Sequence, residues 1–266
     1  MMIEVTSYSN VTCVKGTVKL KGIQLAVHTY LTDFMLIDTG PVSLLNYFIP
    51  FFKENDFDSV SLTHYHEDHT GCAPWIPKSL NVPIYIHPLA IDECLNVSDY
   101  PQFRKDFWGE RGAFRALPLQ ERFQSRNEIW KVIPTPGHAK DHVVFLNTST
   151  GMLFSGDLFV TSKPKAILPD ESISTMVSSL RTILTYDFME MFCSHAGYIP
   201  DGKGALKRKL HYLENLKSDI LDLSWSGLSA NEIKEVLFPQ PPALVTRSNN
   251  DWDSIYIIKN VLEEDE

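Results

Sequence analysis

The sequence predicts an α+β fold, with strands in the interior and helices on the outside. Short apolar runs rich in β-branched residues recur from residue 3 to residue 192, bounded by turn-forming residues. Other segments repeat apolar residues with the spacing of a helix. The 44% hydrophobic content of the 266 residues is enough for a substantial core, so we expect one large domain or one domain with an appendage.

The N-terminal half begins with strands. Alternating segments within residues 3–37 predict antiparallel strands at 11–14, 17–20, 25–30 and 34–37. A helix is expected over 43–54, where the apolar residues have helical spacing. Strands near 59–63 and 83–87 follow.

The second half of the chain continues this pattern. Strands are expected near 129–134, 142–147 and 151–155. Residues 171–185 predict an amphipathic helix whose apolar face carries Ile173, Met176, Val177, Leu180 and Leu184.

Helical patterns alone continue after residue 201. An amphipathic helix is predicted around Leu206, Leu213 and Ile220, and residues 229–232 have the sequence of a capping box that opens a short helix. Prolines at 239–242 end that helix, and a last helix is predicted over 253–264. We therefore expect one domain over 1–200 and a helical extension over 201–266. The extension would line a cleft, mediate dimer contacts or cover one face of the domain.

Residues 64–69 hold the most informative motif. They contain His64, His66, Asp68 and His69, and they directly follow the strand predicted at 59–63. Imidazole and carboxylate groups together suit zinc, iron or manganese. A lone histidine in a turn is more often a hydrogen-bonded surface residue than a metal ligand. Here that explanation would have to hold for several residues at once, so we give it little weight. The segment therefore predicts a metal site.

Three later positions share one pattern: a short apolar strand, then small or turn-forming residues, then a metal-binding side chain. His138 follows Pro-Thr-Pro-Gly, Asp157 follows Phe-Ser-Gly, and His195 follows Phe-Cys-Ser. This pattern predicts that all three side chains lie at strand ends on one rim of a sheet.

With these positions in order, the chain resembles the metallo-β-lactamase-fold hydrolases, in particular the glyoxalase II and lactonase-like group. The resemblance covers roughly residues 1–200, and Asp38, in the sequence Leu-Ile-Asp-Thr-Gly, matches an early strand-end aspartate of the family. It implies a four-layer αββα sandwich with the site at one edge of the two sheets, followed in some members by a helical extension.

The resemblance also implies two divalent metal ions. The first would be held by His64, His66 and His138, and the second by Asp68, His69 and His195, with Asp157 bridging the two. Asp38 would fix the ligand loop through hydrogen bonds. We expect zinc, with manganese or iron also compatible. A bridging hydroxide would attack the substrate, and the second metal, Asp68 or water would assist the leaving group.

Substrate contacts are harder to predict. Residues 96–127, rich in arginine and aromatic side chains, lie between metal-bearing turns and are one candidate wall of a pocket. The loop 158–170 directly follows Asp157, so Phe159 and Lys163 are candidates for substrate binding, as is Tyr198 just after His195.

Composition limits the partners and the compartment. The net charge of −9 argues against general nucleic-acid binding, which needs a basic surface. The four cysteines form no metal-binding or disulfide spacing, so we expect free, buried thiols. No secretory leader and no membrane-spanning stretch are visible, which favours a cytoplasmic protein. A small-molecule substrate is expected, and a homodimer through the tail stays open.

Four functions remain possible at this point. The preferred hypothesis is a dinuclear hydrolase of a small ester, lactone or thioester. The second is a phosphodiesterase or ribonuclease of the same fold, against which the missing basic stripe counts. The third is a persulfide dioxygenase with one iron held by His64, His138 and Asp157. The fourth, a metal-stabilised binding protein without turnover, does not need so complete a ligand set.

Overall fold

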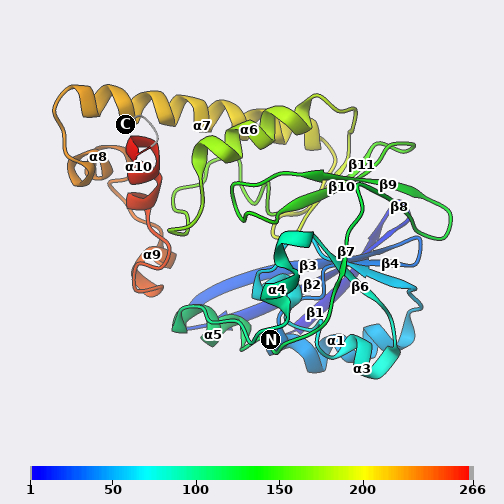
Figure 1. Ribbon diagram of the computed structural model, residues 1–266. Helices are drawn as coiled ribbons and strands as arrows, with labels where there is room; N and C mark the ends of the chain where they lie inside the picture. Colours follow the sequence, from blue (N-terminus) through cyan, green and yellow to red (C-terminus); the bar gives the residue numbers. More distant parts are fainter. Residues whose placement is uncertain (1, 264–266) are drawn as a thin grey trace.

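Two β-sheets lie face to face, and helices cover both outer faces (Figure 1). The computed structural model describes residues 2–263. Its layers follow one another as helix, sheet, sheet and helix, and further helices follow at the C-terminal end. The predicted α+β sandwich with a helical extension is therefore confirmed.

The first sheet, within the described residues, has seven strands in the order β1 to β7. The chain pairs antiparallel through β4 and then in parallel through β5, β6 and β7. The segments predicted separately at 11–14 and 17–20 are one strand. Gly16 lies between these two segments, pairs with Val27, and leaves room for the side chains of Leu44 and Phe48. The strands are β1 Met2–Tyr8, β2 Val11–Leu20, β3 Ile23–Thr32, β4 Met35–Ile37, β5 Ser59–Ser61, β6 Ile84–Ile86 and β7 Leu117–Pro118.

The second sheet has six strands in this part of the chain, in the order β13-β12-β11-β10-β9-β8. Its strands pair antiparallel except for β11 and β12, which run parallel and are joined through helix α6 (Ile173–Leu184). The strands predicted near 129–134, 142–147 and 151–155 correspond to β9, β10 and β11. The bounds are β8 Arg122–Gln124, β9 Ile129–Pro134, β10 Val143–Asn147, β11 Met152–Gly156, β12 Met191–Cys193 and β13 Gly197–Ile199.

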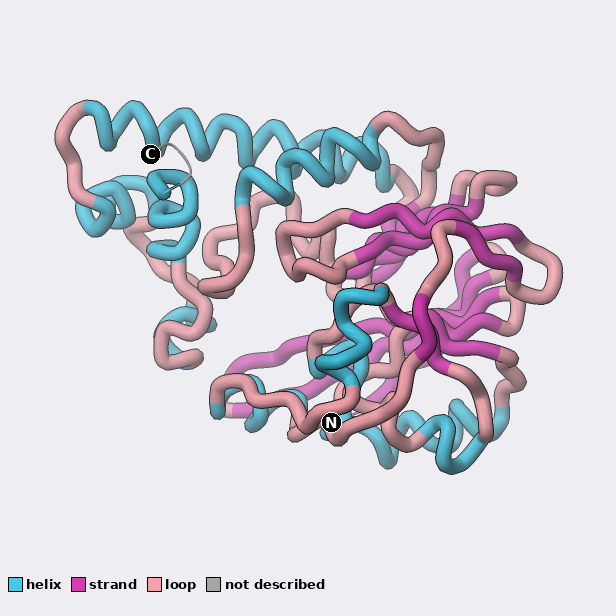
Figure 2. Tube along the Cα trace, in the orientation of Figure 1, coloured by secondary structure: helices cyan, strands magenta, loops and turns pink. Residues whose placement is uncertain are grey.

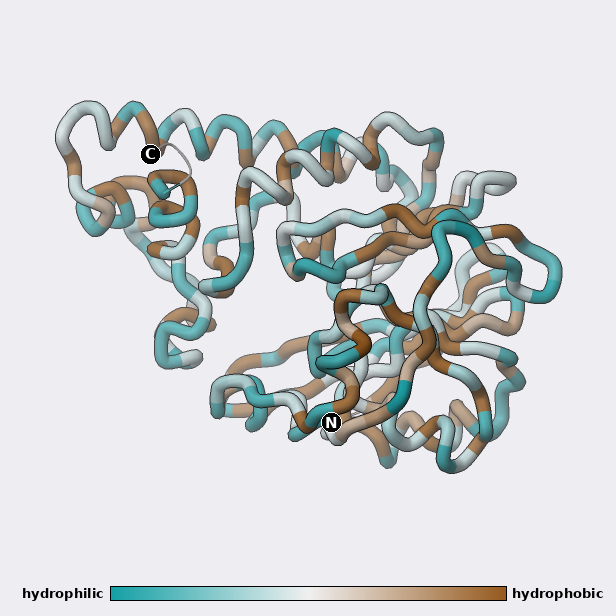
Figure 3. The backbone as a smooth tube through the Cα atoms, viewed as in Figure 1, coloured by the Kyte–Doolittle hydropathy of each residue, from teal (hydrophilic) through white to brown (hydrophobic). Residues whose placement is uncertain are grey.

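Strand periodicity explains how one chain builds three apolar layers. In β10, Val143 and Phe145 face the other sheet, whereas Val144 and Leu146 face the outer helices. Successive side chains of a strand point to opposite faces, so a fully apolar strand serves two cores at once. Trp130 and Phe154 complete the layer between the sheets. Figure 2 shows the strands of the two sheets between the outer helices, and Figure 3 shows hydrophobic residues recurring along these strands.

The outer helices follow the predicted positions. The helix expected over 43–54 is a short 3₁₀ turn, Val42–Leu44, that continues into α1 (Leu45–Glu54). Together with neighbouring short helices it covers the first sheet, and α6 and α7 (Gly202–Trp225) cover the second. The other helices on the first-sheet side are α2 Glu67–Thr70, α3 Ile76–Leu80, a 3₁₀ turn Pro88–Ala90, α4 Ile91–Cys94 and α5 Gln102–Trp108.

The C-terminal helices lie beside α6 and below the end of α7 (Figure 1). Helix α8 (Ala230–Leu237) begins with the predicted capping box, in which Ser229 and Glu232 bond each other's backbone. Helix α10 (Ser254–Glu263) matches the last predicted helix, and residue 264 lies outside the described residues. Helix α9 (Ala243–Arg247) was not predicted, because five residues after a proline run are too short for a periodic signal. The division at residue 200 stays a prediction.

Two further expectations concern the chain as a whole. All four cysteines are free and buried, as expected. Across residues 2–263, the helices include none whose length and apolar character would let it cross a membrane.

Candidate metal centre

The predicted ligands come together at one rim of the sandwich. His64 and His66 lie in the loop after β5, and Asp68 and His69 lie in α2, which follows directly. His138 lies in the loop between β9 and β10, Asp157 directly follows β11, and His195 lies between β12 and β13. Strands β11 and β12 are parallel, so their carboxyl ends meet at the same edge and bring together the last two ligands, Asp157 and His195.

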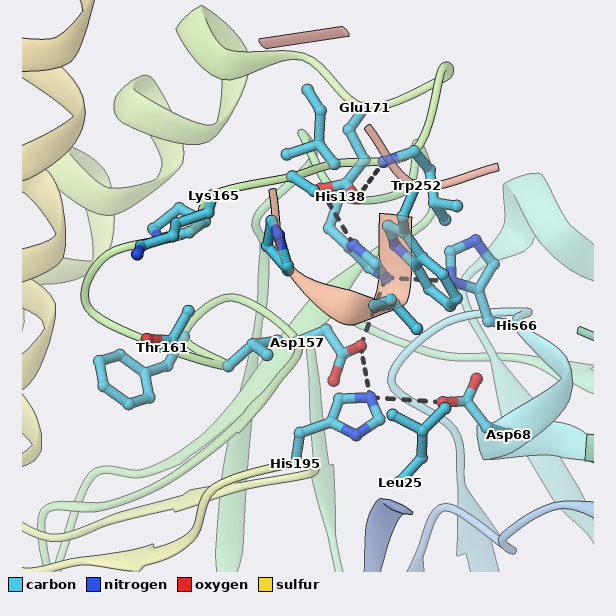
Figure 4. Close-up of a pocket in the computed structure, with 18 of the residues that line it drawn as sticks. Leu25, His66, Asp68, His138, Asp157, Thr161, Lys165, Glu171, His195 and Trp252 are labelled. Atoms are coloured by element: carbon cyan, nitrogen blue, oxygen red, sulfur yellow. Dashed lines mark hydrogen bonds and ion pairs between the residues drawn. The ribbon is translucent and has the colours of Figure 1, made fainter. Parts of the chain in front are cut away.

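Three groups of donor atoms are close enough to hold a cation. They are His64, His66 and His138; His64, His69 and Asp157; and Asp68, His69 and His195, with all ligand atoms of a group within 4.8 Å of one another. Oδ2 of Asp157 lies 3.4 Å from His138 Nε2 and 3.1 Å from His195 Nε2, so this carboxylate stands between the first and the third group (Figure 4). All seven residues predicted as ligands therefore belong to one cluster.

The donor atoms fit a metal better than they fit one another. Nε2 of His64 and of His69 and Oδ1 of Asp157 are buried without a hydrogen-bond partner in the described part of the chain. Buried polar atoms are rarely left unpaired, so these atoms are placed to act as ligands of a cation. His138 Nε2 and His66 Nδ1 lie 3.0 Å apart, a separation at which both lone pairs can point to one ion. The residues present therefore fit divalent metal ions.

Electrostatics separates the histidines into two kinds. Burial, followed by the effect of His69, holds the pKa of His64 well below its ordinary value, and burial does the same for His66. These rings are neutral, which is the form that binds a metal. For His195, burial lowers the pKa, but the carboxylates of Asp157 and Asp68 together outweigh this effect, and the pKa lies well above its ordinary value. A bound cation would therefore displace a proton from this ring.

Asp38 holds the ligand loop from behind. Its Oδ2 accepts from His69 Nδ1 at 2.8 Å, and its Oδ1 accepts from the backbone N–H of Thr63 at 2.8 Å. The Thr63 hydroxyl donates to the same carboxylate and lies 3.0 Å from His64 Nδ1. These bonds direct the Nε2 atoms of both rings toward the cluster. The structure thus places Asp38 where the resemblance implied, behind the ligands.

Three further contacts support the ligand cluster. Glu171 Oε2 lies 3.3 Å from His138 Nδ1, and the carbonyl oxygen of Ala26 lies 2.7 Å from His195 Nδ1 (Figure 4 shows Glu171). His142 Nε2 accepts from the backbone N–H of Asp157 at 3.0 Å. The proximity of His142 to the His138 loop was the only local signal, because the other two partners are distant in sequence.

Glycines immediately before two of the ligands are required by close packing. Gly137 has a φ of +133°, and a Cβ there would lie 2.6 Å from the backbone nitrogen of Met176. Gly156 has a φ of +48°, and a Cβ there would lie 2.6 Å from His142 Nε2. Only glycine adopts these conformations without strain, which explains the Gly-His and Gly-Asp pairs of the sequence.

Replacing Asp38 with asparagine tests its supporting role. An amide keeps the shape but weakens the charged hydrogen bonds to His69 and Thr63, so we expect metal affinity to fall about 10- to 100-fold. Activity at saturating metal should fall much less. Competition with a chromophoric chelator measures the affinity, and wild-type metal retention in Asp38→Asn would remove this role.

A cavity of about 280 Å³ opens beside the ligands. Phe159 lines it, as predicted, and so do Arg104 and Trp108 from the arginine-rich stretch. Lys163 is exposed and is not among the lining residues, and Tyr198 stacks on Tyr8 at 4.3 Å. The structure therefore places Lys163 and Tyr198 outside the cavity. The side chain of Lys163 faces solvent. The ring of Tyr198 packs against Tyr8 of β1 instead of reaching the cavity.

The match to known families agrees with this geometry. The family model of the metallo-beta-lactamase superfamily matches residues 29–195, which include every ligand of the cluster. The chain belongs to the metallo-beta-lactamase superfamily.

Individual members of the superfamily share the fold but little sequence. The chain is 25% identical over 223 residues to the beta-lactamase-like protein 2 homolog of Drosophila melanogaster, across 78% of this chain and 71% of that protein. It is 29% identical over 155 residues to a hydroxyacylglutathione hydrolase of Hydrogenovibrio crunogenus, across 55% and 48% of the two chains. A metallo-beta-lactamase family protein from Thermus thermophilus superposes with a TM-score of 0.70 at 17% identity, over 96% of this chain and 94% of that one. The chain is a metal-dependent hydrolase of this superfamily.

Proposed function

We propose that this metallo-beta-lactamase superfamily member hydrolyses a small ester, lactone or thioester with two divalent metal ions, zinc being the expected metal. The position of Asp157 carries the proposal, because its Oδ2 stands 3.4 Å from His138 Nε2 and 3.1 Å from His195 Nε2. A carboxylate shared between two donor groups is suited to two adjacent cations. The hydroxyacylglutathione hydrolase among the relatives supports an acyl substrate, since acylglutathione is a thioester.

The bound ions would supply a hydroxide nucleophile at neutral pH and polarise the substrate carbonyl. The protein's own groups prepare the site for this chemistry. Asp38, Glu171 and the carbonyl of Ala26 fix three imidazoles through their Nδ1 atoms, so the opposite nitrogens stay directed inward. Such preorganisation removes the cost of reorienting the ligands during the reaction.

Asp68 is the proposed proton carrier. It lines the cavity, and its Oδ2 lies 3.3 Å from His195 Nε2. Burial raises its pKa, but His69 and His195 outweigh this and hold the pKa below its ordinary value. Asp68 therefore starts as a carboxylate at the wall of the cavity, where it can take a proton and pass it to the leaving group.

The cavity favours acyl esters over phosphodiesters. Its lining is mostly apolar, and the whole chain carries a net charge of −9. A polyanionic nucleic acid gains little at such a surface, because its affinity comes mainly from cationic contacts to phosphate.

A substrate panel tests the proposal. Metal-loaded protein is offered p-nitrophenyl esters, aliphatic lactones, acylglutathione thioesters, bis-p-nitrophenyl phosphate and single-stranded RNA, with chelator-treated protein as the control. We expect metal-dependent turnover of at least one acyl compound and much slower cleavage of the phosphodiesters. Cleavage of RNA without cleavage of any acyl compound would contradict the proposal.

A further inference from the structure

The C-terminal extension supplies one wall of the cavity beside the metal ligands. Pro242, Leu244 and Trp252 line this cavity together with His66 and His138. Figure 4 shows Trp252 among the side chains that surround the ligand cluster, and Figure 1 shows that α9 reaches from the helical extension toward the end of the sandwich that carries α5. The segment 242–252, which contains α9, is therefore part of the site, although it lies far from the ligand motifs in sequence.

Hydrogen bonds anchor this wall at its C-terminal end and at its middle. Ile167, in the loop after β11, exchanges backbone hydrogen bonds of 3.4 and 3.2 Å with Asp253. The Asp253 carboxylate also forms a 2.6 Å ion pair with Lys234 of α8. At the middle of the segment, Arg247 donates to the carbonyl oxygen of Lys21 in the β2–β3 turn. The wall is thus tied both to the loop behind Asp157 and to the first sheet.

Apart from the metal ligands and Lys165, which lines the cavity as an exposed residue, the charged side chains around the cavity are bound to protein partners. Arg104 forms two bonds of 2.7 and 2.6 Å with Glu67. Glu171 lies 3.3 Å from His138, and Lys209 donates to two backbone carbonyl oxygens of the loop after β11. Beyond the metal ligands, Lys165 is the charged lining residue that faces solvent, so the buried part of the cavity offers little charge to a polar substrate group.

Most of the remaining lining is apolar. Leu25, Phe159, Met176, Leu244 and Trp252 come from different elements and face one space. Trp252 is itself held edge-on against Phe103, with ring centroids 5.9 Å apart. Ligand pockets usually span roughly 300–1,000 Å³, so a cavity of about 280 Å³ admits only a small group.

We infer that the segment 242–252 binds the apolar acyl group of the substrate, and that Trp252 limits its length. The inference rests on the proposed function and narrows its substrate class to esters or thioesters of small apolar carboxylic acids. Each methylene that fits between these walls should raise kcat/KM about fourfold, and a chain that reaches Trp252 should lose that gain.

A chain-length series tests the inference. The rates of p-nitrophenyl acetate, butanoate, hexanoate, octanoate and decanoate are compared in wild-type protein, in Trp252→Ala, which widens the cavity, and in Leu244→Phe, which narrows it. Trp225→Ala removes an indole that is 72% exposed at the end of α7 and serves as the matched control. We expect Trp252→Ala to raise the ratio of octanoate to butanoate cleavage at least tenfold. Leu244→Phe should lower this ratio, and Trp225→Ala should leave it within twofold.

Calorimetric titration of the metal-loaded protein with the free carboxylates provides a second measurement that needs no turnover. The affinity should rise from acetate to the preferred length, and Trp252→Ala should move that length upward. Esters cleaved with one unchanged length profile in all variants would overturn the inference but leave the proposed function standing. If no acyl compound is cleaved, the proposed function fails and the titration alone decides. Length-dependent binding that changes in Trp252→Ala then supports the acyl pocket, and length-independent binding overturns it.

Discussion

Asp157→Ala should lower kcat/KM for the best acyl substrate at least about 1,000-fold. Its carboxylate stands between His138 and His195, so its loss removes a donor from both sides of the cluster. Losing several kcal/mol of metal-dependent stabilisation corresponds to this factor at about 1.4 kcal/mol per tenfold change. The fold should persist, because Asp157 lies at the rim and contributes nothing to the apolar layer between the sheets.

A matched substitution controls for a general loss of structure. Asp187, whose side chain is fully exposed, lies at the start of the loop after α6, and Asp187→Ala should keep wild-type activity within twofold. Circular dichroism and elemental analysis accompany the rates, so that loss of fold, loss of metal and loss of chemistry can be separated. Activity of Asp157→Ala within tenfold of wild type would refute the assignment of this residue to the centre. His66→Ala should behave in the same way as Asp157→Ala.

Glu67→Ala should destabilise the protein by about 3 kcal/mol, although Glu67 is not a predicted ligand. The side chains of Glu67 and Arg104 are 2% and 11% exposed and form two hydrogen bonds. Removing the carboxylate leaves a buried guanidinium without its counter-charge, and this loss costs more than the pair itself contributes. Urea denaturation at matched metal content measures the change.

An exposed pair of the same residue types provides the control. Glu214 pairs with Arg181 at 2.7 Å, with 37% and 64% of the side chains exposed, so Glu214→Ala should cost less than about 1 kcal/mol. In the double variant Glu67→Ala/Arg104→Ala, the loss should be smaller than the sum of the two single losses, because no charge is stranded. Equal losses for Glu67→Ala and Glu214→Ala would show that burial does not strengthen the dependence on this pair.

The fold class and the members of the ligand cluster could both be predicted from the sequence, because both follow from short-range patterns. Apolar alternation marked the strands, and the Gly-His and Gly-Asp pairs marked the tight turns that follow β9 and β11. Ligands at the ends of neighbouring strands must then lie near one another, whatever the details of packing. The capping box at Ser229 was predictable for the same reason, since its partner Glu232 is only three residues away.

Contacts between distant segments could not be predicted. Glu171 contacts His138, and Ala26 contacts His195, because separate elements meet in three dimensions, and no residue pattern marks those meetings. The wall formed by Trp252 is a stronger example. It depends on where α9 and the backbone bridge at Asp253 place a segment that follows a proline run. Nearness in sequence can also mislead. Tyr198 lies close to His195 in the sequence, but its ring stacks on Tyr8 and does not line the cavity.

The metal content per chain tests the central claim most directly. Elemental analysis of purified protein, run beside Asp157→Ala, should find close to two zinc or manganese ions per chain in the wild type and fewer in the variant. Two ions are expected because the group of His64, His66 and His138 and the group of Asp68, His69 and His195 lie on either side of Asp157. No bound metal after incubation with zinc, or a single iron per chain with oxygen-dependent activity, would contradict the dinuclear hydrolase.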